Sequence, residues 1–153
     1  MVQNMDMEPN ARELYDADFF QWTMRNAELL RAARFEEADV KHIAEEIEDM
    51  GKRERRQLRS RLAVLVAHLL KWQIQVQRRS GSWSATVNEQ RERLNELLTD
   101  SPSLRKYLCT TLVKTYAEAV RHASAQTGLS VSRFSPDCQF SLDQILDSTF
   151  YPE

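Results

Sequence analysis

The sequence predicts an all-α fold, a bundle of five to six helices, from its composition and its apolar periodicity. Its 153 residues include only 3 Gly and 4 Pro, so few positions supply the turns that an all-β fold requires. Apolar residues make up 42% of the chain and charged residues 29%, which is too hydrophobic for a disordered protein. The mean hydropathy of −0.57 is too polar for a membrane bundle.

The domain organisation is expected to be simple. Residues 1–13 are polar and acidic and are predicted to form a flexible lead without the features of a signal peptide. Residues 14–153 are predicted to form one helical domain, long enough to bury a core without disulfides. The longest apolar run, residues 62–70, is too short to cross a bilayer. A cytoplasmic protein without a membrane association is therefore expected.

Two helices are predicted in the first third of the chain. The first runs from Asp16 to Arg34, with Asp16 or Asp18 as its N-cap. Its expected inner positions have helical spacing: Phe19, Thr23, Ala27 and Leu30. A short acidic helix follows from Asp39, its expected N-cap, to Gly51. Its expected inner positions are Val40, Ile43, Ile47 and Met50.

The strongest periodic signal follows Gly51 and predicts a long helix over about residues 52–78. Its inner positions step by four and three residues: Leu58, Leu62, Leu65, Leu69, Trp72 and Val76. Charge is segregated around Gly51, because residues 36–49 hold seven acids and one base and residues 52–61 hold six bases and one acid. Six bases in the first turns of a separate helix oppose its macrodipole, a penalty that a helix continuous through Gly51 avoids. We expect a kink at Gly51, and the continuous helix is the alternative.

Three further helices are predicted after Ser80. One ends by Asp100, with Ser82 or Ser84 as its cap and with apolar inner positions: Trp83, Val87, Leu94, Leu97 and Leu98. The second long helix covers about residues 102–127, between Ser101 with Pro102 and Gly128. Its inner positions are Leu104, Leu108, Leu112, Thr115, Ala119 and Ala123. Ser141 to Gln144 have the pattern of a capping box that opens a short last helix.

Several short motifs occur in one order along the chain. They are Asp18-Phe19-x-x-Trp22, Glu45-Glu46-Ile47-Glu48-x-Met50-Gly51, His68-Leu69-Leu70-Lys71-Trp72, Arg79-Ser80-x-Ser82-Trp83 with Gln90-Arg91, and the closing segment Ser141 to Pro152. In these motifs the sequence resembles the bacterial family known as domain of unknown function 29, from about Leu14 to Pro152. The resemblance implies an all-helical cytoplasmic domain and no established activity.

A polar cluster is the first candidate site. At about 100° per residue, His42, Glu46 and Asp49 share one flank of the acidic helix, while Arg61 and His68 share a flank of the next. If these helices are antiparallel, the flanks meet. The candidate cluster comprises Glu46, Asp49, Arg61, His68 and Arg79. Its simplest interpretation is an ion-pair and hydrogen-bond cluster that fixes the helix register.

A metal site is the alternative interpretation of the same flanks, because carboxylates and imidazoles on facing helices hold metals in bundles. The candidate ligands are His42, Glu46 and His68. The paired Glu-x-x-His of di-iron bundles is absent, so we predict neither a metal nor another cofactor.

A basic patch is the second candidate site. It consists of Lys52, Arg53, Arg55, Arg56 and Arg59. Clustered arginines suit phosphate contacts, but a nucleic-acid-binding domain normally carries a strongly positive charge, and this chain has a net charge of −2. Nucleic-acid binding is therefore possible but not favoured.

The function expected from the sequence is that of a non-enzymatic interaction or regulatory module. The chain has no Gly-x-Ser-x-Gly, no His-Glu-x-x-His and no glycine-rich phosphate loop, and no catalytic residue is predicted. Its segregated charges favour a protein partner or a homo-oligomer. The first alternative is a metal-binding or hydrolytic helical enzyme with the Glu/His/Arg site, and the second is a nucleic-acid binder through residues 52–61.

Overall fold

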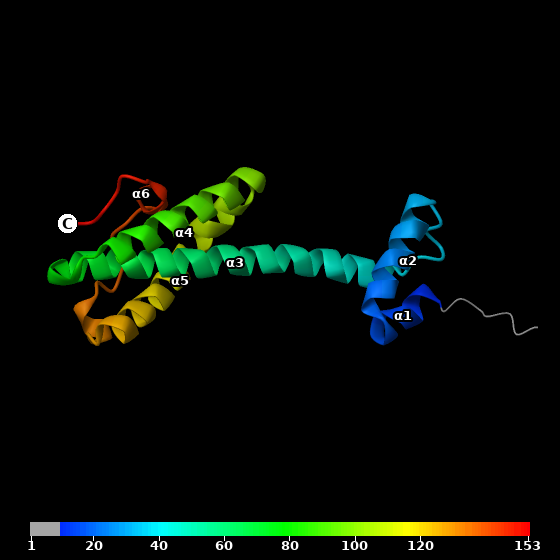
Figure 1. Ribbon diagram of the computed structural model, residues 1–153, viewed down its shortest axis with the longest axis horizontal. Coiled ribbons are helices and arrows are strands. Elements are labelled where there is room, and N and C mark those ends of the chain that lie inside the picture. Colours follow the sequence, from blue (N-terminus) through cyan, green and yellow to red (C-terminus); the bar gives the residue numbers. More distant parts are fainter. Residues whose placement is uncertain (1–9) are drawn as a thin grey trace, which may run out of the picture. The chain divides into compact units, whose positions relative to one another are not determined.

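The computed structural model describes residues 10–153, which fold into helices joined by turns and loops (Figure 1). No strand occurs among these residues. The α-helices are α1 (Ala11–Ala17), α2 (Phe19–Arg31), α3 (Val40–Ile74), α4 (Gly81–Asp100), α5 (Leu104–Thr127) and α6 (Leu142–Leu146), with 3₁₀ helices η1 (Val76–Arg78) and η2 (Val131–Arg133). The predicted all-α fold is confirmed, with α3 and α5 as long helices and α6 as the short last one.

The chain divides into two compact units, residues 1–52 and residues 53–153. We call them the N-terminal unit and the C-terminal unit, and each is described by itself. Of the predicted lead, residues 1–9 lie outside the described part of the chain. Residues 11–13 already belong to α1, because the Asn10 side chain caps this helix by accepting a hydrogen bond from the Arg12 N–H. One domain over residues 14–153 stays a prediction.

Helix α3 corrects the predicted division at Gly51. The two helices predicted at 39–51 and 52–78 are one helix from Val40 to Ile74, with Gly51 in its interior. Lys52 forms ion pairs with Asp49 (2.8 Å) and Glu48 (4.0 Å), which lie on the other side of the glycine. In one helix the bases after Gly51 also lie far from the positive N-terminal end of the macrodipole. Both effects favour a continuous helix, although a glycine costs it about 1 kcal/mol.

Replacing Gly51 by alanine is expected to raise the free energy of unfolding by about 0.5–1 kcal/mol. A Cβ atom at Gly51 meets no other atom within 4 Å, so the gain in helix propensity is not offset by a clash. Urea unfolding of the variant and the wild type measures the difference. Gly128→Ala is the contrasting variant, because Gly128 has a φ of 73° and alanine is strained there. A Gly51→Ala variant less stable than the wild type would contradict the uninterrupted helix.

The N-terminal unit packs α1 and α2 against the start of α3. Asp18 is the N-cap of α2, as one of the two predicted caps, and accepts a hydrogen bond from the Gln21 N–H. Helix α2 ends at Arg31 and not at Arg34, because the chain turns at Ala33, which has a positive φ of 56°. The buried apolar side chains of this unit are few: Ala11, Leu14, Trp22, Leu29 and Ala38.

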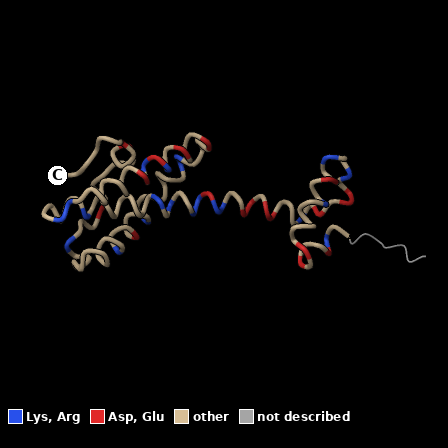
Figure 2. The backbone as a smooth tube through the Cα atoms, viewed as in Figure 1, with Lys and Arg blue, Asp and Glu red and all other residues tan. Residues whose placement is uncertain are grey.

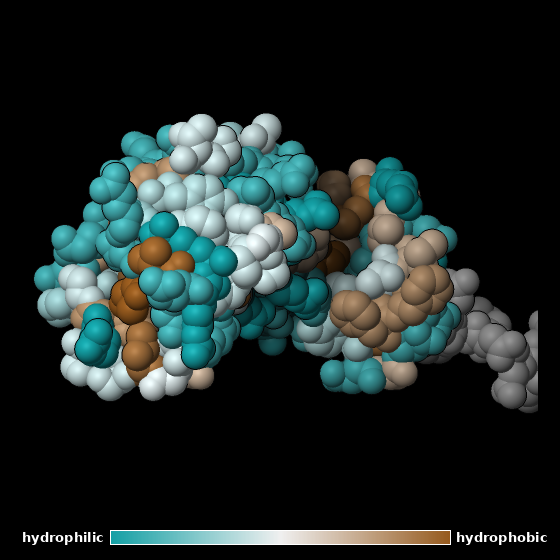
Figure 3. All heavy atoms as spheres, turned by 60° about the vertical axis from the view of Figure 1, so that its left-hand side comes forward, coloured by the Kyte–Doolittle hydropathy of each residue, from teal (hydrophilic) through white to brown (hydrophobic). Residues whose placement is uncertain are grey.

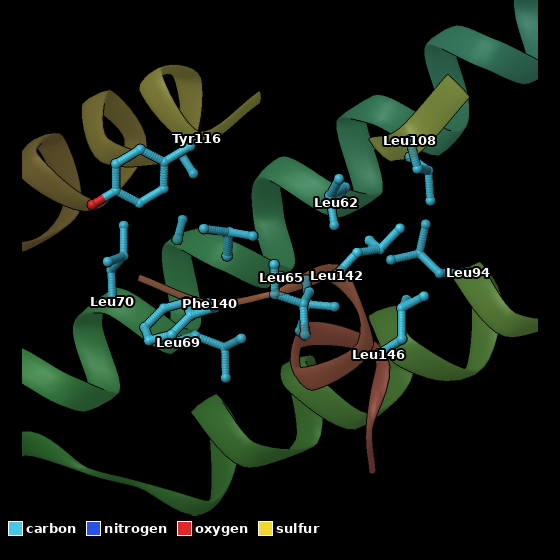
Figure 4. Packing of buried hydrophobic residues seen from close by; sticks show 14 of the residues in the cluster. Leu62, Leu65, Leu69, Leu70, Leu94, Leu108, Tyr116, Phe140, Leu142 and Leu146 are labelled. Atoms are coloured by element: carbon cyan, nitrogen blue, oxygen red, sulfur yellow. The ribbon is translucent and has the colours of Figure 1, made fainter. Parts of the chain in front are cut away.

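The C-terminal unit contains the larger core, shared by α3, α4, α5 and α6 (Figure 4). Leu58, Leu62, Leu65 and Leu69 of α3 are completely buried, which confirms four of the six predicted inner positions. Trp72 is half-buried, and Val76 is exposed because α3 ends before it. The residues that pack against this seam come from all three other helices and the loop before α6: Leu94, Leu108, Phe140, Leu142 and Leu146.

Some of the residues predicted to begin or end the helices of the C-terminal unit do so, and others do not. Ser80, and not Ser82 or Ser84, caps α4 by accepting a hydrogen bond from the Trp83 N–H. Ser101 ends α4 instead of capping α5, because a tight turn over Pro102 delays the next helix to Leu104. Gly128 ends α5 in the left-handed conformation, as predicted. The predicted capping box of α6 is present in full.

Candidate functional site

The predicted polar cluster loses its structural basis, because its two antiparallel helices do not exist. Glu46 and Asp49 lie on the same helix as Arg61 and His68. Glu46 and Asp49 belong to the N-terminal unit and the other members to the C-terminal unit. Each member also has a local partner of its own, described below.

The members in the C-terminal unit bind side chains and carbonyls close to them. Arg61 donates to Gln90 Oε1 at 3.2 Å, and His68 Nδ1 lies 2.9 Å from the Val64 carbonyl oxygen. Burial lowers the pKa of His68, and the charge of Lys71 adds to this effect. Arg79 Nε donates to the Trp72 carbonyl at 2.9 Å. That carbonyl is in the last turn of α3, so Arg79 satisfies one of the carbonyls left without a partner where α3 ends. The end of α3 at Ile74 corrects the predicted end near residue 78.

Arg91 is the most buried charged side chain of the C-terminal unit, with 2% of its surface exposed. Its guanidinium donates to the carbonyls of Ile145 (2.8 Å), Ser148 (3.5 Å) and Phe150 (2.5 Å), and it lies over the Tyr151 ring. Arg91 therefore fastens the segment after α6 to α4. The prediction missed this role, although position 91 continues the inner face of Val87, Leu94 and Leu98, which was a usable signal.

Lys71 is a second buried cation that the sequence prediction missed. Only 6% of its surface is exposed. Its Nζ donates to Gln126 Oε1 at 2.9 Å and lies 4.4 Å from the centre of the Trp83 ring. Burial lowers the pKa of Lys71. These contacts join α3 to α4 and α5, and they account for the half-buried Trp83 as a partner of a cation.

The predicted basic patch is largely engaged by neighbouring groups. Lys52 pairs with Asp49 in the N-terminal unit. In the C-terminal unit, Arg55 lies 5.2 Å from the centre of the Tyr107 ring, and Arg59 Nε lies 3.8 Å from Glu118 Oε2. Arg53 and Arg56 are exposed. The patch thus includes contacts that hold α3 to α5, and nucleic-acid binding stays a prediction.

A network of polar and aromatic side chains holds the N-terminal unit together, and Asp39 is at its centre. The Asp39 carboxylate, 2% exposed, accepts hydrogen bonds from Trp22 Nε1 at 3.1 Å and from His42 Nδ1 at 2.6 Å. The Asp39 N–H donates to Asn26 Oδ1 at 2.8 Å. Tyr15 stacks on the His42 ring with centroids 3.9 Å apart and donates to Glu46 Oε1 at 2.8 Å.

The pKa values in this network indicate its charge state. Burial alone would raise the pKa of Asp39, but hydrogen bonds from His42 and Trp22 outweigh it and hold the pKa below its usual value. Because an ionised carboxylate only accepts hydrogen bonds, His42 Nδ1 is the donor. The hydrogen bond to Glu46 raises the pKa of Tyr15 to about 12. Asp39 is therefore ionised and Tyr15 is protonated. The Asp39 carboxylate also accepts a hydrogen bond from the backbone N–H of His42, as predicted for a helix N-cap.

The candidate metal ligands are not brought into one group. His42 and Glu46 both contact Tyr15, whereas His68 bonds within its own helix turn. In residues 10–153 no three His, Cys, Asp or Glu side chains are placed to hold a metal ion.

The predicted inner positions of the N-terminal unit are only partly covered, which corrects two predictions. Of those predicted on α2, Phe19 and Leu30 are exposed and Thr23 and Ala27 are half-buried. On α2 the buried residues are Trp22, Asn26 and Leu29. The exposed large apolar residues form what we call the α2 stripe: Phe19, Phe20, Met24 and Leu30. Two hydrogen bonds determine instead which face of α2 points into the unit. Trp22 Nε1 donates to the Asp39 carboxylate, and Asn26 Oδ1 accepts from the Asp39 N–H.

On α3 the same correction applies to the α3 stripe, which consists of Val40, Ile43, Ile47 and Met50. Val40, Ile47 and Met50 are 56%, 63% and 61% exposed, and Ile43 is half-buried. The helix turns Asp39, His42 and Glu46 toward Trp22 and Tyr15, which leaves the stripe to one side. Figure 3 shows apolar side chains in tan and brown on the N-terminal unit, at the right of the view.

The α3 stripe is wide and has acidic borders. At about 100° per residue, its apolar arc covers about 120°, the width of a core-facing helix surface. In angular order the arc holds Met50, Ile43, Ile47, Val40, Gly51 and Ala44. Glu46 follows at one edge and Glu48 at the other, with Lys41 and Lys52 beyond Glu48. Figure 2 shows the acidic turns of this part of α3 in red. In residues 10–52 as a whole, eleven acids stand against six bases.

A comparison with known protein families shows the family to which this chain belongs. The family model of DUF29, a domain of unknown function, matches residues 14–151. The protein belongs to the DUF29 family. No curated protein and no solved structure matches it. The resemblance expected from the motifs is thus confirmed as to the family, and the function of the DUF29 domain has to be argued from its own geometry.

Two sets of side chains in the DUF29 domain bear on its function, one buried and polar and the other exposed and apolar. Its buried polar groups, Asp39, Lys71 and Arg91, are bonded to the chain's own atoms. Its large exposed apolar groups are concentrated in residues 19–50. None of the helices in the described residues has the length and hydropathy needed to span a bilayer.

Proposed function

We propose that this DUF29 protein is a non-enzymatic interaction module that binds a protein partner through the α2 and α3 stripes. One observation carries the proposal. Two successive helices carry stripes of large apolar residues, and all of these side chains except Ile43 are exposed among the described residues. Of the eleven large apolar residues that are exposed in residues 10–153, eight lie in residues 19–50, and seven of these belong to the two stripes. Exposed apolar side chains that are clustered rather than scattered mark interaction surfaces.

The size of the expected effect supports binding. Burying one large apolar side chain such as Phe20 or Ile47 contributes about 1.5–3 kcal/mol. Association costs about 4–15 kcal/mol in lost freedom of motion. Burial of several of the exposed stripe residues is therefore of the size needed to offset this cost.

The contrast with the polar sites argues for binding rather than catalysis. Asp39 and His42 meet the first geometric requirement of acid–base chemistry, a carboxylate that orients an imidazole. However, Tyr15 stacks on the imidazole face, and Asp39 also caps α3 and binds Trp22. The pair is accounted for by the stability of the N-terminal unit. In the stripes, Ile43 packs against the buried cluster of Ala11, Leu29 and Ala38, and the exposed members have no such role.

Ile47→Asp and Phe20→Asp are expected to reduce capture of a specific partner at least about tenfold, because each places a charge in the contact. The measurement is quantitative mass spectrometry of proteins retained from a lysate by immobilised full-length protein, with light scattering for self-association. Val113→Asp is the matched control, because Val113 is 79% exposed on α5 and lies outside both stripes.

The wild type and Val113→Asp are expected to retain the same partner, and both stripe variants to lose it. A wild type that is monomeric and retains no protein beyond those retained by the stripe variants would overturn the proposed function.

A further inference from the structure

The spacing of the α3 stripe indicates the shape of its partner. Val40, Ile43, Ile47 and Met50 step by three, four and three residues along about 15 Å of helix. This is the spacing at which one helix packs its side chains between those of another. A strand or a flat loop surface would match only part of it.

The borders of the stripe indicate the charge of its partner. Glu46 and Glu48 flank the apolar arc, and residues 36–49 carry a large excess of acids. Glu48 lies at the limit of ion-pair distance from Lys52, at 4.0 Å, and a carboxylate that accepts one hydrogen bond can accept others. In helix pairs, charges beside the apolar seam select partners of the opposite sign.

A second copy of this chain does not satisfy both requirements. Two α3 stripes face to face would place acids against acids. The chain's own basic segment, residues 52–61, carries its apolar side chains Leu58 and Leu62 completely buried in the C-terminal core, so it cannot present an apolar seam. An anionic lipid surface is also disfavoured, because it repels the acidic borders.

We infer that the α3 stripe binds a cationic amphipathic helix of another protein, with apolar residues at spacings of three and four and Lys or Arg on both sides. The inference rests on the proposed function and names the chemistry of the partner. The partner's apolar residues fill the seam between Val40 and Met50, and its cations lie opposite Glu46 and Glu48.

The test uses two synthetic amphipathic peptides of about 18 residues, with the same leucine seam and with either lysine or glutamate elsewhere, because a helix in a groove is recognised by such anchors. Fluorescence anisotropy measures their binding to the full-length protein. The lysine peptide is expected to bind at least about tenfold more tightly than the glutamate peptide. Raising the salt from about 50 mM to about 500 mM is expected to weaken it several-fold.

Matched variants separate the stripe from general charge attraction. Ile47→Gln is expected to weaken binding of the lysine peptide about tenfold, and Val113→Gln to leave it unchanged. Glu48→Gln at the border is expected to weaken it several-fold, whereas Glu89→Gln, exposed on α4, is not. Thermal unfolding of each variant confirms that it is folded.

The outcomes distinguish this inference from the proposed function. Equal binding of both peptides, no binding of either, or equal effects of Ile47→Gln and Val113→Gln would overturn the cationic helix. Stronger association with vesicles of phosphatidylserine and phosphatidylcholine than with the lysine peptide would also overturn it. In each case a partner that is captured by the wild type and lost by Ile47→Asp would leave the proposed function standing.

Discussion

Arg91→Ala is expected to lower the free energy of unfolding of the C-terminal unit by about 3 kcal/mol or more. The substitution removes the donor of three carbonyls, those of Ile145, Ser148 and Phe150. It also leaves a cavity where a side chain with 2% exposure stood. In a unit of about 100 residues, such a loss lowers Tm by more than about 10 °C. Calorimetry measures the change, and hydrogen exchange locates it in residues 141–152.

Arg93→Ala is the matched control for Arg91→Ala. Arg93 lies on the same helix, is exposed, and pairs with Glu96 at 3.1 Å, so its loss is expected to cost less than about 0.5 kcal/mol. Arg91→Lys is expected to fall between the two, because an ammonium keeps the charge without the planar fork that reaches three carbonyls. If Arg91→Ala and Arg93→Ala have the same Tm, the closing segment is held by its apolar side chains instead.

Asp39→Asn is expected to destabilise the N-terminal unit by about 2 kcal/mol, the range for a buried hydrogen bond to a charged group. The amide loses the charge that His42 and Trp22 bind. Because the pKa of Asp39 is held below its usual value, the stabilisation is complete above the pKa of an unfolded Asp, about 3.9. It is lost as the pH falls through the lower pKa of the folded state.

The wild type is therefore expected to lose stability in this acidic range more steeply than Asp39→Asn. Trp22 is the only tryptophan in residues 10–52, so its fluorescence in a Trp72→Phe, Trp83→Phe background follows this unit. Asp16→Asn is the control, because Asp16 is exposed on α1. Parallel acid transitions of the wild type and Asp39→Asn would show that other carboxylates dominate.

The periodic signal predicted the C-terminal unit well and the N-terminal unit poorly, for a physical reason. Spacing shows that a helix has an apolar stripe but not what covers it. Leu58 to Leu69 meet apolar faces of α4, α5 and α6. In the N-terminal unit, the hydrogen bonds that Trp22 and His42 donate to Asp39 compete with the burial of apolar side chains. They determine which faces of the helices point into the unit. The helical spacing of Ile43 and Ile47 was predicted correctly, but the prediction that both are buried was wrong.

The polar sites were hard to predict because charged residues are normally assigned to the surface. Arg91 and Lys71 are exceptions whose partners are backbone carbonyls, an amide and an aromatic ring, none of which stands out in a sequence. The continuous helix at Gly51 was foreshadowed by the charge segregation around it. The low helix propensity of Gly51 predicts a kink, whereas the unfavourable macrodipole of a separate basic helix predicts continuity, and the second effect prevails.

The bonds of Arg91 also determine when the C-terminal unit completes its folding during synthesis. Its partners follow it in the chain by 54, 57 and 59 residues, so α3, α4 and α5 leave the ribosome before the segment that closes their core exists outside it. Contacts over such separations form late. Until residue 150 emerges, Leu65 and Leu94 lack part of their cover and the Arg91 guanidinium is hydrated. At that stage the incomplete core exposes apolar surface, the condition that makes folding intermediates prone to aggregation.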